Sequence, residues 1–184
     1  MDNIEYNREL SSTKARVAEL EQQNTKLISQ LQRLYPEAIH DPETNIFSNA
    51  YFHTRLKEEI VRSERYRHYL SLILIHVELK DRQSTQQITR EISRIGRELM
   101  SGLTRRNDVV ALYSKRQMIV MLPETDPRGA VLLMNRFMST FPNNGRRLTY
   151  SILSYPNDAT NIEMILNQIH ERSENLFRGH TEKV

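Results

Sequence analysis

The chain has 184 residues, no cysteine and a formal net charge of +3, which suits one domain with an extension. The lack of cysteine excludes disulfides and thiolate metal sites. Arginines are scattered among acidic residues, so we do not expect nucleic-acid binding. The N-terminus lacks the pattern of a secretory signal, and no apolar stretch approaches the roughly 20 residues that span a bilayer. We therefore expect a cytoplasmic protein.

A heptad pattern runs through residues 3–34. Its a and d positions form one narrow helical stripe, because the spacing alternates between three and four residues. An asparagine at a core a position favours a two-stranded parallel coiled coil. We therefore predict a homodimer through a parallel coiled coil; the alternative is a single amphipathic helix that lies on its own domain. The predicted dimerisation residues are Leu10, Val17, Leu20, Asn24, Leu27, Leu31 and Leu34.

Pro36 ends the heptad pattern, because proline disfavours helical backbone in the residue before it. Three parts follow from this boundary. We predict a coiled-coil dimerisation helix at residues 1–36, a globular domain at 37–178 and a flexible tail at 179–184.

The globular domain alternates between helical and strand patterns. The most hydrophobic run, residues 70–79, predicts the central strand of a covered sheet. The full order predicts an α/β (α+β) sandwich, in which helices flank a mainly antiparallel sheet. The expected elements are a helix capped by Ser48, the strand at 70–79, a helix striped by Ile88, Ile92, Ile95 and Leu99, a hairpin at 109–122, a helix opened by Asp126-Pro127, a strand at 148–155 and a helix opened by a capping box of Thr160 and Glu163.

Two segments carry a resemblance to a known family. Residues 41–52, DPETNIFSNAYF, and the hairpin within residues 105–123 resemble the opening motif and the central hairpin of GGDEF domains, the cyclic di-GMP synthases. The family's opening motif has glycine where this chain has Asn45. The resemblance covers roughly residues 41–178 and implies the nucleotide-cyclase-like fold. Where the family's turn reads Gly-Gly-Asp/Glu-Glu-Phe, this chain has Ser114, Lys115, Arg116, Gln117 and Met118.

The resemblance also implies that the chemistry of the family is absent. In GGDEF domains the metal ligands are an aspartate of the central strand and the third residue of the turn, and here these positions hold His76 and Arg116. A guanidinium repels the magnesium ion that phosphoryl transfer needs. His76 and Glu78 share one strand face, but two ligands do not make a metal site. The loop at 80–87 is short and lacks the family's guanine-contacting pairs, which implies that the substrate pocket is deleted. We therefore predict a protein that is not an enzyme.

One ligand-binding pattern is retained. GGDEF proteins often carry Arg-x-x-Asp before the turn as an inhibitory site for cyclic di-GMP, and Arg105 and Asp108 match it, with Arg136 as a third residue on the following helix. An arginine fork can donate to guanine or clamp phosphate, and an aspartate can accept from guanine N–H groups. The alternative is a local ion pair between Arg105 and Asp108, which is common in charged sequences.

Two functions remain open. The first is a catalytically inactive cyclic di-GMP receptor that needs no cofactor and signals through contact with an unidentified protein partner. The second is a nucleotide-independent scaffold that dimerises through its coiled coil and docks a partner, with Arg105 and Asp108 merely bracing the hairpin.

Overall fold

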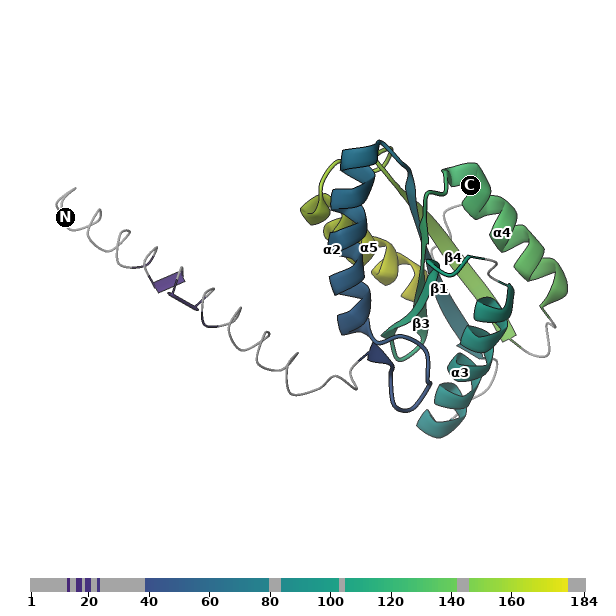
Figure 1. Cartoon of the computed structure of the whole chain (residues 1–184). Helices are drawn as coiled ribbons and strands as arrows, with labels where there is room; N and C mark the ends of the chain where they lie inside the picture. The colour runs from purple at the N-terminus through teal and green to yellow at the C-terminus, as the bar shows by residue number, and fades with distance from the viewer. Residues whose placement is uncertain are drawn as a thin grey trace. The chain divides into compact units, whose positions relative to one another are not determined.

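The structure is a computed structural model of the chain (Figure 1). It describes residues 39–79, 84–102, 105–141 and 146–178, together with Thr13, Arg16, Val17, Glu19, Leu20 and Gln23. The chain divides into two units, Met1–Ala38 and Ile39–Val184.

The described residues of the first unit are helical. Val17 and Leu20, an a and a d position of the heptads, are each 49% exposed. Arg16 pairs with Glu19 of its own chain at 2.7 Å. The other predicted dimerisation residues and the predicted tail lie outside the described residues, so the coiled coil and the three-part division stay predictions. The remaining members of the stripe are Leu10, Asn24, Leu27, Leu31 and Leu34.

The second unit is built on a four-stranded antiparallel sheet in the order β2-β3-β1-β4. The strands are β1 (Leu70–Leu79), β2 (Val109–Ser114), β3 (Gln117–Pro123) and β4 (Arg146–Tyr155). The apolar run predicted to be central is β1, which pairs with β3 on one side and β4 on the other. The predicted fold class is confirmed.

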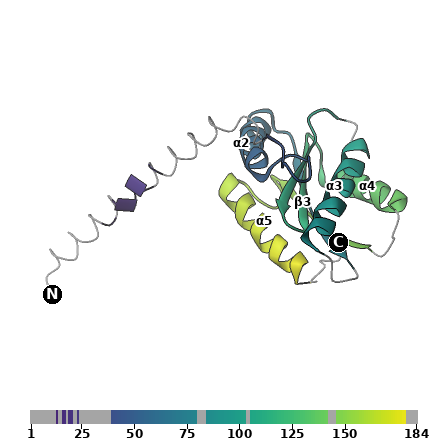
Figure 2. The same cartoon turned by 90° about the horizontal axis from the view of Figure 1, so that it is seen from below.

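Four helices cover the two faces of this sheet: α2 (Asn49–Tyr66), α3 (Thr85–Gly102), α4 (Pro127–Thr140) and α5 (Ile162–Phe177). Figure 2 shows α2 and α5 on one side of the strands and α3 and α4 on the other. The result is a three-layer sandwich, because each face of a hydrophobic sheet must be buried against other elements.

The alternation of β1 divides the core into two clusters. Leu70, Leu72 and Leu74 pack against α2 and α5, whereas Ile73 and Ile75 pack against α3 and α4. A strand places successive side chains on opposite faces, so a strand covered on both faces must be apolar throughout.

Side chains cap the helices largely as predicted. Ser48 Oγ accepts from Tyr51 N at 3.1 Å, and Asp126 Oδ1 accepts from Gly129 N at 2.7 Å. The predicted cap of the last helix is wrong by one residue. Asn161 Oδ1 accepts from Met164 N at 2.9 Å, whereas Thr160 Oγ1 turns to the sulfur of Met164. Asparagine and threonine compete for adjacent cap positions, and asparagine is the stronger capping residue.

Candidate functional site

The loop before α2 is held by its own side chains. Asp41 Oδ1 accepts from the backbone N of Thr44 at 2.8 Å and from Thr44 Oγ1 at 2.6 Å. Asn45 has φ of 61°, a left-handed conformation that asparagine tolerates better than other residues with a side chain. Asparagine thus suits this backbone at the position where the resembled motif has glycine, the other residue type that tolerates it. Ile46, the next residue, is fully buried.

The turn between β2 and β3 is tied to the end of the central strand. Val77 N donates to Arg116 O at 2.8 Å, and the Ser114 and Gln117 side chains are 3.0 Å apart. Lys115 is exposed and Arg116 half-buried, whereas Met118 is fully buried in the core. The five turn positions therefore divide into exposed Ser114 and Lys115, half-buried Arg116, and two buried residues, Gln117 and Met118, that anchor the turn.

Gln117 joins the turn to the last helix. Its side chain is on the α5 side of the sheet and the residue is 3% exposed. Gln117 Nε2 donates to Ser173 O at 2.8 Å, and Ser173 Oγ donates to Gln117 Oε1 at 2.6 Å. Sequence reasoning missed this contact, because the two residues are 56 positions apart and only the packing of α5 brings them together.

The two strand positions His76 and Glu78 have different surroundings. His76 is buried and lies opposite Gln117 and Thr149 in the neighbouring strands. Burial lowers the pKa of His76; Glu78 opposes this effect and the positive charge of Arg116 adds to it. Glu78 is exposed, and its carboxylate lies 3.8 Å from Arg147. Within the described part of the chain, no group of three or more possible metal ligands exists.

A groove lies between the loop before α2, the first turns of α3 and the tip of the hairpin. Its volume is about 680 Å³. Ile88, Ile92 and Leu112 give it apolar walls, and Lys115 and Arg116 lie at the hairpin side. A space therefore exists beside the hairpin; whether the family's substrate pocket is lost stays a prediction that rests on the short loop after β1. Its hairpin side carries two cations.

Arg105 lies against the loop between β3 and α4. Its Nη1 donates to Thr125 Oγ1 at 3.2 Å and to the backbone oxygens of Pro123 and Glu124, both at 3.4 Å. Among the described residues, no hydrogen bond joins the Arg105 guanidinium to the carboxylate of Asp108. The hydrogen bonds of the Arg105 guanidinium thus run to a segment about 20 residues later in the sequence, while its charge still acts to lower the pKa of Asp108.

Arg136 lies beside the end of α3. Its Nη2 donates to Gly102 O at 2.8 Å, and it lines a second cavity of about 340 Å³ between α3 and α4. No hydrogen bond of the described residues links Arg136 to Arg105 or Asp108. The structure thus places the three predicted ligand residues on segments that border one another, without direct contact between their charged groups.

Asp108 has an unsatisfied carboxylate oxygen. The residue is half-buried, and its Oδ1 has no hydrogen-bond partner among the described residues. Burial raises the pKa of Asp108, although the charge of Arg105 and a hydrogen bond from the backbone work in the opposite direction. A buried acceptor without a partner is costly, so a donor that reached this oxygen would gain a hydrogen bond that the described residues do not supply.

The raised pKa of Asp108 predicts how stability depends on pH. A carboxyl whose pKa is raised by folding stabilises the protein fully below its unfolded pKa, and that contribution is lost as the pH rises through the folded pKa. Asp108→Asn should therefore be more stable than the wild type near neutral pH, by up to about 1 kcal/mol because the half-exposed charge is screened. The difference should vanish below about pH 4. Urea unfolding near neutral pH and below about pH 4 measures this difference in stability. Glu171→Gln, at an exposed position of α5, is the control. An Asp108→Asn variant that is less stable than the wild type at neutral pH would contradict the prediction.

Comparison with known proteins identifies the class of domain that this fold and hairpin define. The sequence model of the family described as "Diguanylate cyclase, GGDEF domain" matches residues 38–179. The chain belongs to the GGDEF family. No curated protein sequence matches the chain.

Solved structures share the fold at low sequence identity. The GGDEF domain of FimX from Pseudomonas aeruginosa is 14% identical, with a TM-score of 0.63 over 77% of this chain and 94% of that chain. The diguanylate cyclase SiaD from the same organism, in complex with its activator SiaC, is 17% identical, with a TM-score of 0.62 over 95% of this chain and 72% of that one. The coiled coil and GGDEF domain of DgcB from Caulobacter crescentus, in complex with c-di-GMP, is 12% identical, with a TM-score of 0.57 over 92% and 96%.

The helices that the structure describes include none that is long and apolar enough to cross a membrane.

Proposed function

We propose that this GGDEF-family protein is catalytically inactive, binds cyclic di-GMP through Arg105, Asp108 and Arg136, and passes the signal on by contact with another protein. The single observation that carries the ligand site is the Asp108 carboxylate, which has a buried oxygen without a hydrogen-bond partner among the described residues. Guanine offers the ring N–H and amino donors that such an acceptor requires. Arg105, three residues earlier, is exposed and can turn toward a phosphate or a guanine edge.

The charges around the hairpin support the loss of catalysis. Joining two nucleoside triphosphates requires divalent metal held by hard oxygen ligands. Near the turn the protein offers the Arg116 guanidinium, whose positive charge contributes to the lowered pKa of His76. Glu78 points to solvent beside Arg147. A cation in the ligand position and a scattered carboxylate do not hold magnesium.

The proposed organisation places a coiled-coil helix at 1–36, the GGDEF domain at 37–178 and a short tail at 179–184. The 49% exposure of Val17 and Leu20 supports a coiled-coil homodimer, because apolar a and d side chains gain free energy when a second helix covers them. DgcB combines a coiled coil with a GGDEF domain and was solved with c-di-GMP, which agrees with this organisation.

A nucleotide-independent scaffold is the second candidate, and one observation favours it. Arg105 already donates to Pro123 O, Glu124 O and Thr125 Oγ1, so it braces the loop before α4 without any ligand. A scaffold would need these contacts only for stability. A receptor must exchange them for contacts with the dinucleotide.

Calorimetric titration with cyclic di-GMP tests the proposal. We expect saturable binding by the wild type, and a loss of about tenfold to a hundredfold in affinity for Arg105→Ala, because charge-assisted hydrogen bonds contribute roughly 1.5–3 kcal/mol. Arg106→Ala, at the exposed neighbouring position, is the matched control and should bind as the wild type does. Cyclic di-GMP should also raise the melting temperature, since the ligand binds only the folded state.

Two results would contradict the proposal. A flat titration of the folded wild type would leave the scaffold function, and equal weakening in Arg105→Ala and Arg106→Ala would show only general charge attraction. Incubation with GTP and magnesium should yield no cyclic di-GMP, and any product that forms would overturn the loss of catalysis.

A further inference from the structure

The last turn of α2 and the residues that lead into β1 carry an exposed group of arginine and aromatic side chains. We call this group the Arg/Tyr surface; it comprises Arg62, Arg65, Tyr66, Arg67, His68 and Tyr69, all exposed. Tyr66 is 56% and Tyr69 44% exposed, and Val61, about one turn earlier on α2, is 65% exposed. Large rings and an aliphatic side chain thus remain in water within one short segment, at a cost in apolar exposure.

Contacts within the surface hold rings and cations together but leave charge unpaired. The Arg65 guanidinium lies 5.4 Å from the centre of the Tyr66 ring, and the rings of Tyr66 and His68 stack at 6.0 Å. Arg62 is 3.5 Å from Glu59, and His68 is 3.7 Å from Glu124. Arg65 and Arg67 form no ion pair with any residue that the structure describes.

The backbone conformation of Arg67 is a second, independent observation that the stability of α2 does not explain. This residue ends α2 in the left-handed conformation, with φ of 55° and ψ of 41°, and its N–H donates to Ser63 O. Glycine or asparagine usually occupies this position, because a residue with a larger side chain pays roughly 1–2 kcal/mol there. The negative end of the helix dipole favours a cation nearby, but it accounts neither for an arginine at the strained residue itself nor for the exposed tyrosines.

We propose that the Arg/Tyr surface docks an acidic protein segment that carries aliphatic or aromatic side chains between its carboxylates. Arginine and tyrosine are the residue types enriched at the centres of protein interfaces, and lysine, which is depleted there, is absent from this surface. Unpaired Arg65 and Arg67 provide charge complementarity to carboxylates. The rings of Tyr66 and Tyr69, together with Val61, provide the apolar area that such a segment would cover.

The acids around the surface favour a protein over a polyanion. Glu64 is exposed on the same turn of α2, and Glu124, which is 53% exposed, borders His68. A nucleic acid or an anionic membrane presents a continuous row of phosphates, which both carboxylates would repel. A peptide can place its own carboxylates opposite Arg65 and Arg67 and leave neutral side chains opposite the acids.

This inference rests on the proposed function in one respect, since it supplies the chemistry of the protein to which a receptor would pass its signal. The docking surface itself does not require cyclic di-GMP. Binding to it is therefore measured in the absence of the dinucleotide, so that failure of the receptor function and failure of the docking surface are separate results.

Fluorescence anisotropy with a defined probe tests the surface. The probe is a short labelled peptide that alternates glutamate with leucine and phenylalanine, and its counterpart has glutamine in place of every glutamate. The full chain should bind the acidic probe more tightly than its neutral counterpart. The double variant Arg65→Glu/Arg67→Glu should lose at least about tenfold in affinity, because two attractive charges become repulsive.

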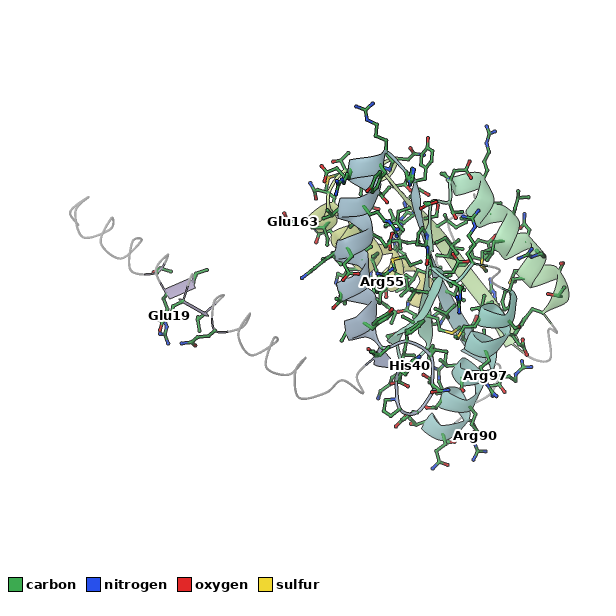
Figure 3. All side chains as sticks on the ribbon, in the orientation of Figure 1. Glu19, His40, Arg55, Arg90, Arg97 and Glu163 are labelled. Carbon is green, nitrogen blue, oxygen red and sulfur yellow. The ribbon has the colours of Figure 1, made fainter. Side chains whose placement is uncertain are left out.

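The matched control is Arg90→Glu/Arg97→Glu, which makes the same change in net charge on α3, where both side chains project from the helix (Figure 3). This control should bind the probe within about twofold of the wild type. Equal weakening in both double variants, or no preference of the wild type for the acidic probe, would overturn the proposal. Tighter binding of oligothymidylate or of phosphatidylserine vesicles than of the acidic probe would overturn it in favour of a nucleic-acid or membrane surface. Unchanged circular dichroism and melting temperature establish that both variants are folded.

Discussion

Gln117→Ala is expected to lower the free energy of unfolding by about 2–4 kcal/mol, because it removes a buried hydrogen-bonding hub and leaves a cavity. Gln117 is 3% exposed and bonds to both the backbone oxygen and the hydroxyl of Ser173. Its loss also leaves Ser114 without the contact that closes the turn. The last helix and the hairpin would thus lose a hydrogen-bonded contact that joins them.

Gln117→Glu separates the hydrogen bonds from the volume. Glutamate is the family's residue at this position of the turn, and its shape matches glutamine. One carboxylate oxygen can still accept from Ser114 and Ser173, but the other replaces the amide that donates to Ser173 O at 2.8 Å. Two acceptors would then face each other in a buried site, which costs more than a lost hydrogen bond. We therefore expect Gln117→Glu to be destabilised near neutral pH and to recover as the pH falls and the carboxyl takes up a proton.

Urea unfolding followed by circular dichroism measures both variants. Gln86→Ala, at an exposed position of α3, is the control for loss of a glutamine side chain and should stay within about 0.5 kcal/mol of the wild type. If the unfolding midpoint of Gln117→Ala were close to that of Gln86→Ala, the hydrogen bonds of Gln117 would not stabilise the domain as predicted. A Gln117→Glu variant as stable as the wild type at neutral pH would show that the site accepts the family residue without cost.

Gly96→Ala should destabilise the domain by up to about 2 kcal/mol, although alanine is normally the better residue in a helix. A Cβ at Gly96 would lie 2.5 Å from Cγ2 of Ile46, a fully buried side chain. Ile46 follows Asn45 in the tight loop before α2, so it has little room to retreat. Overpacking a filled core costs typically 1–3 kcal/mol, which outweighs the helix preference of roughly 1 kcal/mol.

Gly102→Ala is the matched control, because it makes the same change in the same helix. A Cβ there meets no atom within 4 Å, so the variant should be as stable as the wild type or up to about 1 kcal/mol more stable. The two substitutions are thus expected to have opposite signs in chemical denaturation. If Gly96→Ala were also neutral, the contact between α3 and Ile46 would be looser than the structure places it.

These contacts bear on the proposed loss of catalysis. The turn of the hairpin is anchored by Gln117 to α5 and by Arg116 O to Val77 N, and its exposed tip carries Lys115. The anchored turn forms one side of the groove of about 680 Å³. These contacts support a structural role for the turn in place of a catalytic one. Removal of the two cations at the tip should therefore leave the fold intact, since neither makes an ion pair with a described residue.

The order of the elements and the class of the fold could be predicted from local patterns along the chain. The apolar run that became β1, the alternating hairpin and the caps at Ser48 and Asp126 are local patterns, and each is governed by residues close in the chain. The resemblance in the opening motif and the hairpin then identified the family. One cap was misplaced, because Thr160 and Asn161 offer competing oxygens and only backbone geometry decides between them.

The contacts between side chains of distant segments could not be predicted in this way, because they depend on how the helices pack on the sheet. Sequence spacing left open a ligand site and a local ion pair for Arg105 and Asp108. In the structure Arg105 donates to the loop at 123–125, and an oxygen of Asp108 has no hydrogen-bond partner among the described residues. Gln117 and Ser173, or Gly96 and Ile46, come together only because helices pack on the two faces of one sheet. Such contacts depend on where distant segments lie in space, and a periodic pattern along the chain records which face is buried but not which residue lies opposite.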